Sequence, residues 1–94
     1  LLVNIGGYRV KSNRESGNGR PDIVMTESKF RGRAMILELK ISDTIQGMEK
    51  KCEEALTQMK EQKYESSLEG DGYQPILKYA ICFFKKGCMV KKAE

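Results

Sequence analysis

The chain has no histidine among its 94 residues. This absence excludes serine and cysteine nucleophiles that depend on a histidine, histidine general bases, and zinc sites with histidine ligands. Cysteine is scarce as well, because only Cys52, Cys82 and Cys88 are present and no two of them form a CxxC pair. A thioredoxin-like motif and a four-cysteine zinc site are therefore excluded, and we expect buried free thiols in a reducing cytoplasm.

Long apolar runs are also missing. No stretch approaches the ~20 apolar residues of a membrane-spanning helix, and the first residues do not resemble a signal peptide. Apolar residues make up 39% of the chain and charged residues 32%, a balance typical of a soluble folded protein without a membrane partner. The length predicts a single domain over residues 1–94. Because the sequence does not begin with methionine, we expect this domain to be a fragment of a longer cytoplasmic protein.

What the chain does have is a mild excess of positive charge. Seventeen lysines and arginines stand against thirteen acidic residues, which gives a net charge of +4. This excess permits nucleic acid or another polyanion as a partner without requiring one.

The apolar pattern divides the chain into five strands and one helix. Alternating, β-branched or apolar runs predict strands over residues 8–11, 22–26, 34–41, 76–84 and 88–91. From Asp43 onward apolar residues recur every three or four positions, which predicts an amphipathic helix capped by Asp43 and reaching about Leu68. We therefore predict an α/β fold with a mixed sheet, built from a three-strand meander, a crossover helix and two further strands.

The strand over residues 34–41 is apolar at almost every position, which predicts burial on both faces. A single helix covers only one face of a sheet. We therefore expect an upstream helix to cover the other face, with Leu1 to Ile5 as the tail of that truncated helix.

Two charged residues interrupt this buried strand. Glu38 and Lys40 are two positions apart, so both side chains leave the same face of the sheet. Charges in such a place are costly unless they are paired or bound to an ion. Asp22 begins the preceding strand, and antiparallel pairing of the two strands places it near the end of the third.

Two carboxylates and one lysine suit a hard divalent cation, Mg²⁺ or Mn²⁺, which keeps several of its waters. Such an ion clamps a phosphate and lowers the pKa of a bound water, while the lysine orients that water or neutralises developing charge. The group fits phosphodiester hydrolysis without histidine. The alternative is a structural salt bridge of Lys40 with Asp22 or Glu38 in a partly wet cleft.

The segment Pro21-Asp22, followed after fifteen residues by Glu38-Leu39-Lys40, resembles the signature of the PD-(D/E)XK nuclease superfamily. The core of that superfamily is a helix, three strands, a helix and a strand. Residues 8–24, 55–58 and 76–79 extend the resemblance to a domain of unknown function at the C-terminus of bacterial proteins that carry an AAA-like ATPase domain.

The resemblance implies roles for individual residues. Asp22 and Glu38 would hold Mg²⁺ or Mn²⁺, and Lys40 would assist the attacking water. Gln58 lies where several members place a glutamine near the site, and Glu15 would replace an acidic metal ligand of the first core helix. The implied substrate is nucleic acid, DNA rather than RNA.

The sequence leaves open the role of one loop and the choice between a catalytic and a non-catalytic domain. Arg14 and Arg20 flank a glycine-rich loop that is suited to hold phosphates, although an ordinary solvated loop has the same composition. The domain is either a nuclease or a non-catalytic accessory domain. In the second case it binds nucleic acid or docks on an AAA-like ATPase domain of the same chain.

Overall fold

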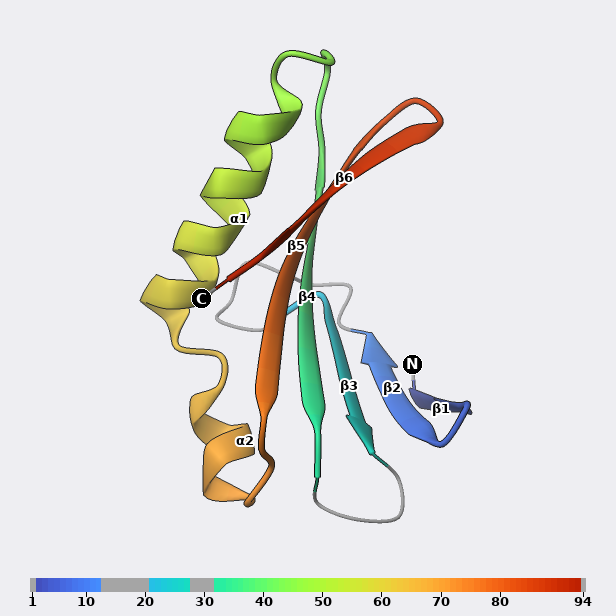
Figure 1. Cartoon of the computed structure of the whole chain (residues 1–94), viewed down its shortest axis with the longest axis vertical. Coiled ribbons are helices and arrows are strands. Elements are labelled where there is room, and N and C mark those ends of the chain that lie inside the picture. Colours follow the sequence, from blue (N-terminus) through green and yellow to red (C-terminus); the bar gives the residue numbers. More distant parts are fainter. Residues whose placement is uncertain (1, 13–20, 28–31, 94) are drawn as a thin grey trace.

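A computed structural model of the protein describes residues 2–12, 21–27 and 32–93. Six strands form one mixed sheet in the spatial order β1-β2-β3-β4-β5-β6, accompanied by two helices (Figure 1). In chain order the elements are β1 (Leu2–Ile5), β2 (Tyr8–Ser12), β3 (Ile23–Glu27), β4 (Ala34–Ile41), α1 (Met48–Gln62), α2 (Ser66–Gly70), β5 (Ile76–Phe84) and β6 (Gly87–Lys92). The predicted α/β fold with a mixed sheet is confirmed.

The connections follow from the pairing of the strands. Strands β1 to β4 pair antiparallel with their neighbours and form a meander. Strand β5 pairs parallel to β4, so the chain must cross back between them, and it does so through α1 and α2. Strand β6 then returns antiparallel to β5.

The first described residues form a strand and not the tail of a helix. Leu2–Ile5 pairs with β2 through a turn at Gly6 and Gly7, whose φ angles are +54° and +83°. Glycine adopts these left-handed conformations without a steric penalty, and a two-residue turn of this kind favours a hairpin. The prediction that Leu1 to Ile5 end a helix is therefore wrong for the residues described.

The core lies between α1 and one face of β4 and β5. Its fully buried members are Ala34, Ile36, Cys52, Ala55, Met59, Ala80 and Cys82. All three cysteines are free, and Cys52 and Cys82 are buried as predicted, whereas Cys88 is exposed. Within the described residues no helix is long and apolar enough to cross a membrane.

Helix α1 begins later than predicted. Its N-cap is Gly47, without a side-chain hydrogen bond, and Asp43 is exposed in the preceding loop. The Ser42 hydroxyl donates to the carbonyl of Thr44 and accepts from its N–H, and the Thr44 hydroxyl oxygen accepts from the N–H of Gly47. These local bonds satisfy the backbone in a non-helical conformation, which is why the apolar spacing does not extend the helix back to Asp43.

The helical region is also interrupted. Lys63 adopts a left-handed conformation with φ of 50°, which ends α1 at Gln62. The short α2 follows after this break and contributes the buried Leu68 to the core. The predicted single helix is thus two helices with different axes (Figure 1).

The other face of the sheet is only partly covered. The side chain of Ile41 is 78% exposed, and Leu37 and Leu39 are half-buried. Phe83 and Val90 also lie exposed on this face. The predicted burial of β4 on both faces is wrong within the described part of the chain, because α1 packs against the opposite face alone.

Candidate active site

The pairing of β3 with β4 brings two carboxylates together. Ile23 lies opposite Leu37, so Asp22, which directly precedes β3, stands beside Glu38. The Asp22 N–H donates to Glu38 Oε1 at 3.1 Å, and the Leu39 N–H donates to Asp22 Oδ2 at 2.7 Å. Each carboxylate is thus oriented by a backbone N–H of the other strand.

Glu38 is buried, with only 1% of its surface exposed. Burial and, to a smaller extent, the charge of Asp22 raise its pKa from 4.5 to about 7. The hydrogen bond from the Asp22 N–H and the charge of Lys40 lower this pKa by less. A bound cation would favour the ionised carboxylate, because opposite charge lowers the pKa of an acid.

The ammonium of Lys40 is held from the helix side. Its Nζ donates to Gln58 Oε1 at 3.0 Å, and Gln58 Nε2 donates to the Tyr64 hydroxyl oxygen at 2.9 Å. Lys40 forms no ion pair with a carboxylate of the described residues. The salt bridge from Lys40 to Asp22 or Glu38, which the sequence left open, is therefore not formed.

Tyr64 is the residue that sequence reasoning missed. It is buried and its pKa is raised, mainly by that burial. A separation of six residues from Gln58 does not place two side chains on the same face of a helix. Lys63, in a left-handed conformation, turns the chain and brings Tyr64 back to Gln58. No pattern in the sequence predicts this turn.

We expect Tyr64→Phe to lower the free energy of unfolding by about 1 kcal/mol, because it removes a part-buried hydrogen bond acceptor and frees the amide of Gln58. Urea unfolding measures this difference. Tyr73→Phe is the matched control, because the hydroxyl of the half-buried Tyr73 has no hydrogen bond within the described residues. Equal losses in the two variants would contradict a specific role of the Tyr64 hydroxyl.

The carboxylates fit a divalent cation. Among the described residues, no group donates a hydrogen bond to Asp22 Oδ1 or to Glu38 Oε2, whereas the other oxygen of each carboxylate accepts one. In proteins Mg²⁺ is usually bound by one or two carboxylates and keeps several of its water ligands. In the described ranges no three acidic or sulfur-bearing side chains gather as a metal cluster. Three further predicted site residues, Arg14, Glu15 and Arg20, lie outside the described residues.

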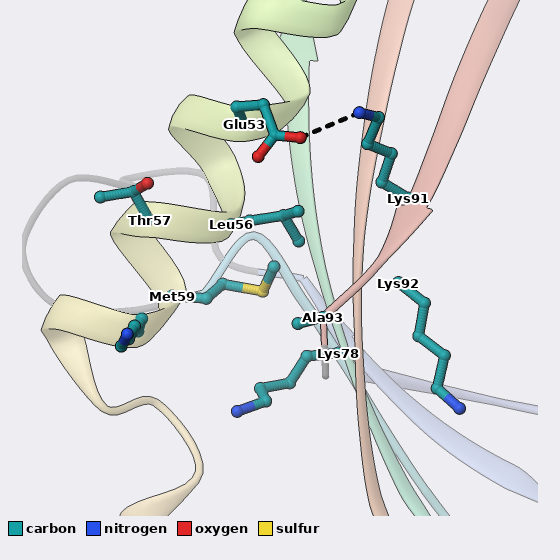
Figure 2. A pocket seen from close by; sticks show the side chains of 9 residues that line it. Glu53, Leu56, Thr57, Met59, Lys78, Lys91, Lys92 and Ala93 are labelled. Carbon is teal, nitrogen blue, oxygen red and sulfur yellow. Dashed lines mark hydrogen bonds and ion pairs between the residues drawn. The ribbon is translucent and has the colours of Figure 1, made fainter.

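A cavity of about 720 Å³ lies elsewhere, between α1 and the strands β5 and β6. Figure 2 shows Lys91 pointing to Glu53 across it, at 2.9 Å between Nζ and Oε1. Lys91 also pairs with Glu49, and Lys78 pairs with Glu65. Neither Asp22 nor Glu38 lines this cavity, and the ammonium groups of Lys78 and Lys91 in its wall are already paired with glutamates.

Comparison with known families gives a match over nearly the whole chain. A family model described as the PD-(D/E)XK nuclease superfamily matches residues 1–93, so the predicted resemblance is confirmed. No curated protein and no solved structure is significantly similar to the chain. The association with an AAA-like ATPase domain stays a prediction.

Proposed function

The chain belongs to the PD-(D/E)XK nuclease superfamily, and from this premise we propose that it hydrolyses phosphodiester bonds of nucleic acid with Mg²⁺ or Mn²⁺. DNA is the preferred substrate of this proposal. The observation that supports it best is the reciprocal orientation of Asp22 and Glu38 by backbone N–H groups. A purely structural carboxylate at position 38 would be costly, because Glu38 is buried and the neighbouring charge of Asp22 disfavours its ionised form.

Asp22 and Glu38 would hold the cation through Asp22 Oδ1 and Glu38 Oε2. When bound, such a cation neutralises charge on the phosphate and lowers the pKa of the attacking water. The backbone bonds from the Asp22 and Leu39 N–H groups keep the two carboxylates oriented before substrate arrives. This preorganisation avoids the cost of arranging the ligands during the reaction.

Lys40 would act on the phosphate and the attacking water. An ammonium group has three donors, and Gln58 Oε1 occupies one of them. The remaining donors stabilise negative charge that develops on the phosphate oxygens, and they orient the attacking water. Gln58 is a positioning residue, because it contacts Lys40 and is itself held by Tyr64.

Cleavage of end-labelled DNA and RNA, single-stranded and duplex, in Mg²⁺, Mn²⁺ or EDTA tests this function. We expect cleavage in either metal and none in EDTA. A folded chain that cuts none of these substrates in either metal would overturn the proposal. That result would favour the accessory domain that binds nucleic acid or docks on a partner domain without turnover.

Lys40→Met should lower the cleavage rate by about 10²-fold to 10³-fold, the usual cost of removing one positioned donor. The variant keeps the apolar stem but removes the hydrogen bond to Gln58 Oε1, so we expect the free energy of unfolding to fall by only about 1 kcal/mol. Lys50→Met is the matched control on the exposed surface of α1 and should cleave as the unchanged protein does. A Lys40→Met variant that loses stability but keeps its cleavage rate would contradict the catalytic role.

A further inference from the structure

Strand β2 carries two cationic residues, Arg9 and Lys11, that have no role in the proposed reaction. Arg9 and Lys11 alternate along the strand with residues of the opposite face, so both point to one side of the sheet. Arg9 lies opposite Thr26, and Lys11 lies opposite Val24. Val24 lies opposite Ile36, which shares its face of β4 with the site carboxylate. Both cations therefore lie on the face of the sheet that holds the candidate active site.

The register also fixes how far these cations are from the site. Lys11 pairs with Val24, and Asp22 comes two residues before Val24 on the same face. Lys11 is thus the diagonal neighbour of Asp22, and such neighbours in an antiparallel pair are about 7–8 Å apart. Arg9 follows two residues away along β2, about 7 Å further. The two cations form a row that leads away from Asp22.

This row is open to solvent. Helix α1 packs against β4, β5 and β6, whereas β1 and β2 lie on the far side of β3 (Figure 1). Arg9 and Lys11 are both exposed. Neither is paired with a carboxylate of the residues that the structure describes, in contrast to Lys78 and Lys91.

We propose that Arg9 and Lys11 bind the phosphodiester backbone of the nucleic-acid strand whose next phosphate lies at Asp22 and Glu38. This inference rests on the proposed function. Its physical basis is charge complementarity, because the two carboxylates repel a phosphate until a cation is bound. A row of cations beside them attracts the backbone and sets its position on the sheet. One row contacts one backbone, which a single strand and a duplex both present.

The test is the salt dependence of binding in EDTA, where the proposed reaction cannot proceed. The double variant Arg9→Gln, Lys11→Gln should show a shallower slope of log K against log salt. Over about 50 to 200 mM salt we expect the slope to decrease by about 1.4 for single-stranded DNA and about 1.8 for duplex DNA. Single-stranded RNA should show the same loss as single-stranded DNA, since both present the same phosphates.

The double variant Lys50→Gln, Lys86→Gln is the matched control. It removes the same charge from two exposed positions, one on α1 and one in the turn between β5 and β6. Its slope should equal that of the unchanged protein. If the double variant on β2 fails to fold, the single variant Lys11→Gln replaces it in the test. Its slope should decrease by about half as much.

The outcomes separate this inference from the proposed function. An unchanged slope in the β2 variants, an equal decrease in the control, or no binding by the unchanged protein at low salt would overturn the binding row. A specific decrease would support the row even if no cleavage is found in Mg²⁺ or Mn²⁺. That result would overturn the proposed catalytic function and support the proposed binding of nucleic acid by Arg9 and Lys11.

Discussion

Asp22→Asn and Glu38→Gln are each expected to lower metal-dependent cleavage by at least about 10³-fold, since the charge stabilisation of a bound cation is worth several kcal/mol. Each substitution removes a negative charge from the proposed metal site and preserves the shape of the side chain. An amide oxygen at position 22 still accepts from the Leu39 N–H, and one at position 38 still accepts from the Asp22 N–H. The local geometry should therefore survive while affinity for the cation falls.

Initial cleavage rates in Mg²⁺ and Mn²⁺ measure this effect, and calorimetric titration with Mn²⁺ measures binding directly. Asp43→Asn is the matched control, because Asp43 is an exposed carboxylate in the loop before α1 and takes no part in the site. It should cleave and bind Mn²⁺ as the unchanged protein does. A rate in Asp22→Asn within about tenfold of the original would remove Asp22 from the metal site.

The metal-free protein should lose stability as the pH rises through neutrality. The pKa of Glu38 is about 7 in the folded chain, above its ordinary value of 4.5, so the folded state binds the proton more tightly than the unfolded state. The contribution of Glu38 is therefore complete below about pH 4.5 and is lost as the pH rises through about 7. The size of this loss is about 3 kcal/mol.

Glu38→Gln should abolish this decline, because glutamine is neutral at every pH and keeps the acceptor for the Asp22 N–H. Urea unfolding in EDTA from about pH 5 to about pH 8 measures the difference, and the variant should be the more stable protein at the upper end. Saturating Mg²⁺ should reduce the gap, since a cation stabilises ionised Glu38. Glu61→Gln, an exposed carboxylate on α1, is the control. Parallel pH profiles for the original protein and Glu38→Gln would contradict the burial argument.

The two effects of Glu38→Gln have opposite signs, and this separates function from structure. If the Glu38 carboxylate stabilised the fold, the neutral Glu38→Gln variant would be less stable than the original protein. If instead Glu38 serves to bind a cation, Glu38→Gln should lower activity. The same substitution should stabilise the metal-free fold, because Glu38 is buried beside Asp22.

The arrangement of the candidate site could be read from the sequence where local rules decide it. Strand alternation puts Glu38 and Lys40 on one face, and the hairpin brings Asp22 to them. The same alternation in β2 puts Arg9 and Lys11 on one face, but only the register shows that this is the face of the site. Tyr64 could not be predicted, because its contact with Gln58 depends on a left-handed residue between two helices.

The sequence by itself determined the order of the last five strands and of the crossover helical region, the absence of histidine chemistry, and the presence of two acidic residues and a lysine at the candidate site. These features depend on composition and on short-range periodicity, which one chain displays directly. The tertiary structure alone decided the start of α1, the strand at Leu2–Ile5, the open apolar face and the raised pKa of Glu38. Each of these depends on which groups exclude water from one another, and burial is a property of the packed chain rather than of any segment.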